Sequence, residues 1–454
     1  MLKKGDNLEL EIIDCGMDFE GIAKVDNFTV FVLGAIVGEK VLATVIKVTK
    51  TYAIAKVDEY ILKSKYRRES VCEVSNRCGG CQAHHIEYNF GLEIKRNNIL
   101  SLFRKQVLDS VVVQNVIGMG LTYYYRNKAQ YPVRKICKVN KIGFYSKKSH
   151  SIIENKGCFI QNRVIDMLAK IIFDKLISLG FSMYSDEEKW GDIKHIIIKR
   201  GYHTSQIMVV IVVSRKELMQ DLRFAKLIED IGKERITSFF LNLNSEDTNK
   251  ILGVQSALIY GEKYITDKIG DCTFYISPKS FFQVNTVQVE VLYNLLKEKL
   301  ELNKEDVLFD LYSGVGTIGI FLSKYVKEVY GIEIEEEAVL MANMNISLNE
   351  VTNCEYIAGS AEEKIEEFKM RNINPDIIVV DPPRKGLDEK CIENILELKP
   401  KKIGYVSCNP ATLARDLKLL SDKYDIGVVT PVDMFPYTSN VECVVVLHQK
   451  KENV

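Results

Sequence analysis

The chain has 454 residues, of which 46% are hydrophobic and 27% charged, and its 61 basic and 61 acidic side chains give a net charge of zero. This composition is ordinary for a soluble globular protein, and the length predicts two to four domains. No apolar run approaches a membrane span and the first residues lack the apolar segment of a signal peptide, so we expect a cytoplasmic protein with no membrane partner. We also expect a monomer.

The first 60 residues alternate apolar and polar positions in short runs separated by glycines. Alternation with period two is typical of strands that have one buried face, and frequent turn residues predict a small β-barrel. Barrels of the OB type often bind oligonucleotides. The runs are Asn7–Ile13, Phe28–Val32, Glu39–Val48 and Tyr52–Val57.

Three cysteines follow the barrel with the spacing C-x5-C-x2-C: Cys72, Cys78 and Cys81. Because the eleven cysteines of a cytosolic protein are expected to be reduced, this spacing suggests a metal site. A fourth ligand is needed. With Cys158 the set has four thiolates for an iron–sulfur cluster, whereas with His84 or His85 it resembles a zinc knuckle, and the residues alone leave both open.

The middle of the chain combines basic and aromatic residues. Between Leu121 and Ser151 there are eight Lys or Arg, six interleaved Tyr or Phe and no Asp or Glu. Such a stretch offers phosphate contacts and stacking surfaces, which favours nucleic-acid binding. We expect an antiparallel sheet with helices on one face. The expected strands are Tyr123–Val133, Ile193–Lys199, Gln206–Val213, Thr237–Leu243 and Thr273–Ser277, and the expected helices are Tyr88–Gln106, Gln161–Leu179 and Lys216–Gly232.

From about residue 286 apolar strands alternate with helical patterns, which predicts a doubly wound α/β domain. The expected strands are Val307–Tyr312, Glu328–Glu333, Cys354–Ala358, Asp376–Val380 and Lys402–Val406, followed by two closing strands, Ile426–Asp433 and Val441–Leu447. Helical patterns lie at Glu335–Leu348 and Leu387–Leu398.

The first strand of this domain leads into a glycine-rich turn, Gly314-Val315-Gly316-Thr317-Ile318-Gly319, and Glu333 ends the next strand. This pattern also describes a dinucleotide site. However, Asp310 lies four residues before the first glycine. Its carboxylate would repel a pyrophosphate and would suit a cationic ligand such as S-adenosylmethionine, with Glu333 on the ribose hydroxyls.

A second motif, Asp381-Pro382-Pro383-Arg384, places a carboxylate at the end of another strand. Methylases of exocyclic amines usually have an aromatic residue after the two prolines, to stack the base. Here Arg384 occupies that position, which favours a carbon atom as the methyl acceptor.

The third motif is Ser407-Cys408-Asn409-Pro410, where Pro410 ends a buried strand and leaves Cys408 at the rim of the sheet. Carbon 5 of uracil accepts a methyl group only after a nucleophile has added to carbon 6. A thiolate can supply that nucleophile, and a base such as Glu442 must then remove the carbon 5 proton. Asp381 could bond the N3–H group of the uracil.

A fourth segment, Ser277–Asn285, precedes the α/β domain and contains two consecutive aromatic residues, Phe281 and Phe282. These rings could stack on an extruded base or on the adenine of the donor, because chemistry at carbon 5 requires the ring out of its stack. Gln283 offers amide contacts to the amino-acid part of the donor.

Taken together, these motifs resemble the RNA uracil-5-methyltransferase family, in particular its TRAM-containing branch that acts on 23S ribosomal RNA. The resemblance covers nearly the whole chain and includes Tyr124-Tyr125-Arg126-Asn127-Lys128. It implies Cys408 as nucleophile, Glu442 as base, and a [4Fe–4S] cluster on Cys72, Cys78, Cys81 and Cys158. It implies donor contacts from Gln283, Tyr312, Thr317, Glu333 and Asp381. The chain departs from the family at Asn440, where a histidine is common.

We therefore expect a TRAM-like barrel at 1–60, a central domain with the cysteine cluster at 61–270 and an S-adenosylmethionine-dependent methyltransferase domain at 271–454. The helix at about 88–106 is expected to pack on the last of these. The favoured function is carbon-5 methylation of a uridine in 23S ribosomal RNA. The alternatives are a uridine in the T-loop of transfer RNA, an NAD-linked iron–sulfur oxidoreductase and a non-catalytic RNA-binding module.

Overall fold

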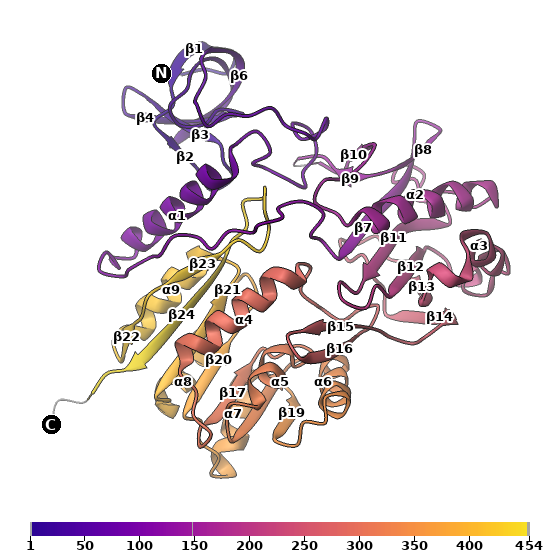
Figure 1. The fold of residues 1–454 in the computed structure, drawn as a ribbon. Helices are drawn as coiled ribbons and strands as arrows, with labels where there is room; N and C mark the ends of the chain where they lie inside the picture. Colours follow the sequence, from indigo (N-terminus) through magenta and orange to yellow (C-terminus); the bar gives the residue numbers. More distant parts are fainter. Residues whose placement is uncertain (1, 148, 452–454) are drawn as a thin grey trace.

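The computed structural model describes residues 2–147 and 149–451, so Lys148 of the basic stretch lies outside the described residues. Figure 1 shows a small lobe at the N-terminus, a sheet with helices beside it in the middle of the chain, and a larger α/β domain that ends at the C-terminus. Within the described part of the chain, no helix is both long and apolar enough to cross a membrane.

The N-terminal lobe is a curled six-stranded sheet in the order β1-β5-β6-β4-β3-β2, antiparallel except for the pair of β4 and β6. Alternate residues of β5 are buried, namely Val41, Ala43 and Val45, and with alternate residues of neighbouring strands they form the core of the lobe. The strands are β1 (Asn7–Glu11), β2 (Asp14–Cys15), β3 (Gly21–Val25), β4 (Phe28–Leu33), β5 (Lys40–Val48) and β6 (Tyr52–Leu62).

Helix α1 (Tyr88–Lys105) lies between this lobe and the C-terminal domain (Figure 1). The Glu87 side chain caps its first turn by accepting from the N–H groups of Asn89 and Phe90. Ile99 and Phe103 are buried in the same core as the strands of the C-terminal sheet, and α1 packs against α9 (Pro410–Leu420).

The central sheet has the order β14-β13-β12-β11-β7-β8. It is not wholly antiparallel as expected, because β12 and β13 are parallel and are joined by a crossover through η1 and α3. Helices α2 and α3 pack on one face, and the other face meets the β15–β16 hairpin and α4. The elements are β7 (Lys128–Ile136), β8 (Val139–Ile142), β9 (Phe144–Tyr145), β10 (Ile152–Ile153), α2 (Arg163–Ser178), β11 (Ile193–Arg200), β12 (Ile207–Val213), η1 (Lys216–Gln220), α3 (Arg223–Ile231), η2 (Lys233–Arg235), β13 (Ser238–Leu243), β14 (Gln255–Gly261), β15 (Ile265–Ile269) and β16 (Cys272–Ile276).

Two expected elements of this region are shorter than predicted. The helix expected at Lys216–Gly232 is interrupted at Asp221, whose carboxylate accepts from the backbone N–H of Arg223 and so competes with helical hydrogen bonding. The strand expected from Tyr123 begins only at Lys128. Tyr124 has a left-handed backbone (φ 58°), and its N–H donates to the carbonyl of Phe159 instead of to the sheet.

The C-terminal sheet confirms the doubly wound prediction. Its order is β19-β18-β17-β20-β21-β24-β22, parallel as far as β21, and β24 runs antiparallel to β21. The first closing strand is broken at Gly427 into β22 and β23, which both pair with β24. The elements are α4 (Thr286–Leu300), β17 (Val307–Leu311), α5 (Thr317–Ser323), β18 (Glu328–Glu333), α6 (Glu336–Leu348), β19 (Cys354–Ala358), α7 (Ala361–Met370), β20 (Ile377–Val380), α8 (Glu389–Leu398), β21 (Lys402–Ser407), β22 (Tyr424–Ile426), β23 (Thr430–Val432) and β24 (Glu442–Gln449).

Candidate active site

Cys408 lies at the carboxyl edge of the C-terminal sheet, between the end of β21 and the start of α9. Pro410 begins the helix and Asn409 caps it, so the strand stops abruptly as its sequence predicts. Ser407 pairs with Cys443 in the antiparallel ladder, so the next position on each strand sets Cys408 opposite Glu442. The thiol is half-buried, and burial, Glu442 and Asp381 raise its pKa to about 11 while Arg384 opposes them.

Glu442 is the first residue of β24 and is only 5% exposed. Burial is the largest influence on this carboxyl, followed by the charge of Asp381. Together they raise its pKa to about 8. A carboxyl with this pKa is poised to accept a proton near neutral pH, which a general base requires.

Asp381 follows β20, the strand between the glycine turn and the cysteine strand. Burial raises its pKa to about 7. The two prolines lead to Arg384, whose backbone carbonyl accepts from the Asn409 side chain at 2.8 Å. This contact ties the turn after Asp381 to the cap of α9, beside Cys408.

The glycine turn connects β17 to α5. Tyr312, Gly314 and Gly316 all have left-handed backbones, with φ of 62°, 55° and 80°. Asp310 is 1% exposed, and one of its carboxylate oxygens accepts from the N–H of Gly319 while the other has no hydrogen-bond partner. Burial is the main reason that its pKa rises to about 7. An acceptor left unpaired and buried beside the turn is suited to a cationic or hydrogen-bond-donating ligand.

Glu333 ends β18, as predicted, and turns back to the glycine loop. One carboxylate oxygen accepts from the N–H of Gly314 at 2.9 Å and the other from the N–H of Glu335 at 3.0 Å. Each oxygen retains a second lone pair, so the carboxylate can still accept from hydroxyl groups of a ligand.

Tyr293 of α4 is a site residue that the sequence does not reveal. Its hydroxyl lies 2.8 Å from the Thr317 hydroxyl at the start of α5. Burial and the nearby carboxylates of Asp381, Asp310 and Glu442 raise its pKa. One phenol therefore lies within electrostatic reach of all three acidic groups. In the sequence, Tyr293 is simply one aromatic residue on the apolar side of a helix, which indicates core packing.

The Ser280–Asn285 segment joins the central sheet to this site. Lys199 of β11 is buried and donates to the carbonyls of Ser277 and Ser280, at 2.6 and 3.0 Å. Gln283 is 8% exposed, and its backbone carbonyl accepts a hydrogen bond from the side-chain amide of Asn127. Phe282 belongs to the hydrophobic core, so of the two expected stacking rings only Phe281, 67% exposed, is free to contact a base.

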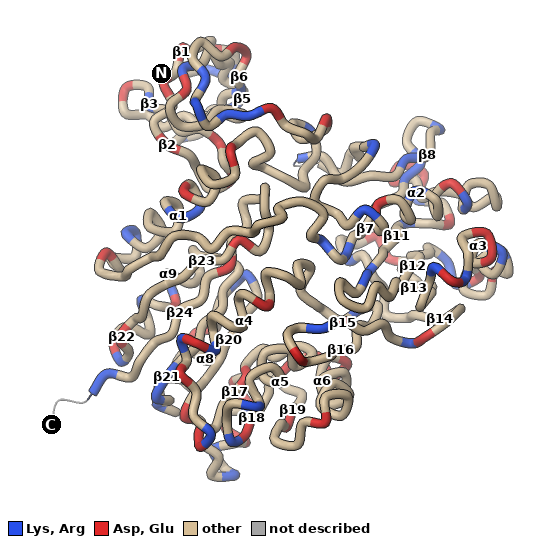
Figure 2. The backbone as a smooth tube through the Cα atoms, in the orientation of Figure 1, with Lys and Arg blue, Asp and Glu red and all other residues tan. Residues whose placement is uncertain are grey.

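Part of the basic stretch is structural rather than exposed. Figure 2 shows Lys and Arg along β7 and β8. Arg134 is buried and donates to the carbonyls of Val133 and Lys194. Lys141 pairs with Glu154 at 3.3 Å. The exposed cations of the stretch are therefore fewer than the sequence suggests.

The four cysteines predicted as cluster ligands lie in one region. The thiol of Cys81 interacts electrostatically with those of Cys158, Cys78 and Cys72. A cavity of about 480 Å³ opens beside Cys72 and Cys158. Within the described residues, however, no three His, Cys, Asp or Glu side chains form a group that could hold a metal ion. His84, the ligand considered for zinc, stacks on Tyr437 with ring centroids 4.7 Å apart.

Two regions of the chain match the profiles of known protein families. The profile of the tRNA (uracil-5-)-methyltransferase family matches residues 201–450, and that of the TRAM domain matches residues 2–57. An uncharacterized RNA methyltransferase of Clostridium tetani is 42% identical over 449 residues, covering 98% of this chain and 97% of that protein. One of Clostridium acetobutylicum is 42% identical over 450 residues and covers 98% of each chain.

Among solved structures, the Pyrococcus abyssi tRNA (uracil-54, C5)-methyltransferase in complex with S-adenosyl-L-homocysteine is similar over 97% of this chain and 100% of that one. The TM-score is 0.77 and the identity 25%. An NAD-linked oxidoreductase is not supported by any of these matches. The profile match over more than half of the chain and the full-length relatives show that this protein is an enzyme of the RNA (uracil-5-)-methyltransferase family.

Proposed function

We propose that this enzyme methylates carbon 5 of one specific uridine in RNA, with S-adenosylmethionine as the methyl donor and Cys408 as the nucleophile. The observation that carries the proposal is the arrangement at one sheet edge. Cys408 and Glu442 are the residues next to the last ladder pair, Ser407 and Cys443, and Asp381 raises the pKa of both groups.

In the proposed reaction the Cys408 sulfur bonds to carbon 6 of the uracil, which places negative charge on carbon 5. The donor supplies the methyl group that carbon 5 takes up. Glu442 then removes the proton from carbon 5, and the bond between carbon 6 and sulfur breaks. Asp381 accepts from the N3–H of the ring, which orients the base. The Arg384 guanidinium lowers the pKa of the thiol and so favours its ionised form.

The acidic groups of the site support a cationic donor. Asp310 and Asp381 carry no compensating ion pair among the interactions of the described residues, and burial raises the pKa of each to about 7. A sulfonium and an ammonium placed near these carboxyls would favour their charged forms. Tyr312 and Thr317 flank the same turn, and Glu333 accepts from the N–H of Gly314. These three residues, together with Gln283 of the preceding segment, are proposed to hold the rest of the donor.

The affinity for the donor is expected to rise with pH. As the pH increases from about 6 to about 8, Asp310, Asp381 and Glu442 lose protons and the site becomes more negative. The Kd of S-adenosylmethionine should fall over this range, whereas S-adenosylhomocysteine, which lacks the sulfonium charge, should show a smaller change. Isothermal titration calorimetry at several pH values tests this. Equal pH dependence for both ligands would contradict the electrostatic argument.

The same groups are expected to make the free enzyme less stable as the pH rises. A buried carboxyl with a raised pKa binds its proton in the folded state at a pH where the unfolded chain has lost it, so the free energy of unfolding falls through this range. Asp310→Asn removes one such group and keeps an oxygen for the Gly319 N–H. The stability of the variant should depend less on pH than that of the wild type, by on the order of 1–3 kcal/mol between about pH 5 and 8. Urea unfolding at these pH values provides the measurement.

For the substrate we propose 23S ribosomal RNA, because the chain combines the TRAM lobe with the cysteine segment in the manner of that branch of the family. Transfer RNA is the second candidate, since the Pyrococcus enzyme with the same overall fold is named for a tRNA uridine. The test is methyl transfer from labelled donor to ribosomal RNA and to transfer RNA from cells that lack the protein. Label at one uridine of 23S RNA, with none in transfer RNA, is the expected result, and the reverse would select the second candidate.

We further propose that Cys72, Cys78, Cys81 and Cys158 hold a [4Fe–4S] cluster, with zinc as the alternative. Four soft thiolates are the donor set that such a cluster requires. The cluster would fix the segment that carries the first three cysteines against the segment of Cys158. Burial raises the pKa of the Cys158 thiol to about 11, so a bound metal centre would be needed to keep it ionised.

Cys158→Ser is expected to lose most of the iron and sulfide of anaerobically purified protein, together with its visible absorption. Cys137→Ser is the matched control, because Cys137 is exposed and lies outside the proposed ligand set. Iron and sulfide assays and the absorption spectrum provide the measurement. Stoichiometric zinc in place of iron in the wild type would select the alternative, and full iron content in Cys158→Ser would remove Cys158 from the ligand set.

A further inference from the structure

The base of the proposed reaction directly follows a loop whose two ends are held together by a buried lysine. Residues 433–441, here called the 433–441 loop, connect the end of β23 to Glu442, and Val432 pairs with Glu442 across the mouth of this hairpin. The position of Glu442 therefore depends on how the two ends of the loop are held.

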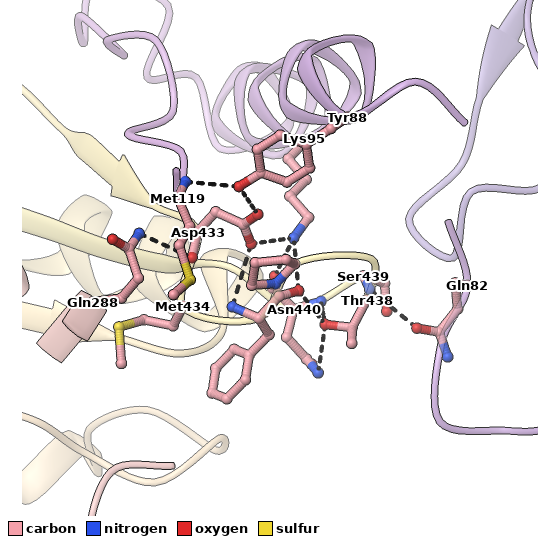
Figure 3. Close-up of polar contacts among 12 residues, drawn as sticks. Gln82, Tyr88, Lys95, Met119, Gln288, Asp433, Met434, Thr438, Ser439 and Asn440 are labelled. Carbon is pink, nitrogen blue, oxygen red and sulfur yellow. Dashed lines mark hydrogen bonds and ion pairs between the residues drawn. The ribbon is translucent and has the colours of Figure 1, made fainter. Parts of the chain in front are cut away.

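Lys95 of α1 holds both ends (Figure 3). Its ammonium donates to a carboxylate oxygen of Asp433 at 2.7 Å and to the backbone carbonyl of Asn440 at 2.7 Å. A longer contact of 3.5 Å reaches the carbonyl of Phe435. Lys95 is 4% exposed and Asp433 is fully buried, so water does not weaken these bonds.

The other atoms of Asp433 are also fixed. Its second carboxylate oxygen accepts from the Tyr88 hydroxyl at 2.8 Å, and that hydroxyl in turn accepts from the N–H of Met119 (Figure 3). The Gln288 amide donates to the Asp433 carbonyl. The start of the loop is therefore held by several hydrogen bonds. Lys95 links it to the carbonyl of Asn440, two residues before Glu442.

The loop also contacts Arg384 on one side and the segment that follows Cys81 on the other. The Asn440 side chain accepts from Arg384, the residue that opposes the acidic groups around Cys408. On the other side, the N–H groups of Gln82 and Ala83 donate to the Tyr437 carbonyl, and the Gln82 side chain accepts from the N–H of Ser439. Gln82 directly follows Cys81, so the cysteine segment supports the same loop.

We propose that Lys95 is a positioning residue for the general base, and that it acts by closing the 433–441 loop so that Glu442 reaches the proton on carbon 5. This inference rests on the proposed role of Glu442. A misplaced base slows only the last part of the reaction. The bond between Cys408 and carbon 6 still forms and the methyl group is still transferred, but the carbon 5 proton stays in place and the enzyme cannot be released.

The test uses full-length Lys95→Met with substrate RNA and donor labelled in its methyl group. Turnover should fall about tenfold to a hundredfold, as expected for a small displacement of a catalytic group. A covalent enzyme–RNA adduct that carries the label should accumulate on a denaturing gel, while the affinity for S-adenosylmethionine stays unchanged. If the single variant folds poorly, Lys95→Met with Asp433→Asn removes the unpaired buried carboxylate and still lacks the bond to Asn440.

Ile99→Ala is the control for a purely structural role. Ile99 lies one turn further along α1 and is fully buried, and its apolar side chain cannot donate a hydrogen bond to the loop. Its loss should lower the melting temperature without accumulating adduct. Lys95→Met that behaves like Ile99→Ala, or like the wild type, would overturn the inference. Glu442→Gln in the same assay distinguishes failure of this inference from failure of the proposed function. Absence of adduct in Glu442→Gln would refute the proposed function itself.

Discussion

Cys408→Ala is expected to abolish methyl transfer to RNA while leaving the binding of S-adenosylmethionine intact. Without the sulfur, the proposed nucleophile for carbon 6 is missing, and carbon 5 is then too weak a nucleophile to take the methyl group. Removal of a nucleophile that acts together with a base typically lowers kcat by about four to six orders of magnitude. The donor is proposed to bind at the glycine turn, one strand beyond Asp381, so its affinity should not change.

The measurement compares labelled methyl transfer with donor affinity for the same preparation. Cys408→Ser should also be inactive, because a hydroxyl in this acidic environment is even harder to ionise than the thiol, whose pKa is already raised to about 11. Cys443→Ala is the matched control. Cys443 is buried in the core formed with α8 and α9, and its side chain lies on the opposite face of β24 from Glu442. Turnover in Cys408→Ala would contradict the mechanism.

The strands and their ends could be predicted from the sequence because local signals define them. Pro410 stops β21 and the paired prolines after Asp381 stop β20, so both side chains could be assigned to the rim without knowing how the sheet is ordered. The ladder ends at Ser407 and Cys443, so Cys408 and Glu442 are the next residues on their strands. Their catalytic roles stay predictions. The domain boundaries and the roles of the donor residues stay predictions.

The supporting contacts could not be predicted, because they join residues that are distant in the sequence. Lys95 and Asp433 are 338 positions apart, and each alone has the appearance of a solvated charge. Tyr293 reaches Thr317 only because α4 packs across the start of α5. Phe282 faces the core and Phe281 faces solvent, a difference that two identical neighbouring residues cannot reveal. Such features depend on tertiary packing rather than on periodicity.

Glu442→Gln is expected to trap the enzyme on its substrate. Glutamine has the shape of the glutamate but cannot accept the carbon 5 proton, so kcat should fall by about two to four orders of magnitude. The rate at which the covalent adduct between Cys408 and the uracil forms should not fall. The Glu442 carboxylate raises the pKa of Cys408, so its replacement by a neutral amide lowers that pKa and makes the thiolate more available. The variant therefore speeds the first step and blocks the last.

The predicted signature is a labelled, denaturation-resistant complex of enzyme and RNA, present in Glu442→Gln and absent in Glu442→Gln combined with Cys408→Ala. Glu355→Gln, the same change at a partly exposed position of β19, should turn over normally. The methyl label makes the test specific. An adduct without label would mean that the reaction stops before methyl transfer, and Glu442 would then act earlier than proposed. A labelled adduct assigns the carboxylate to the one step that follows transfer, the removal of the proton.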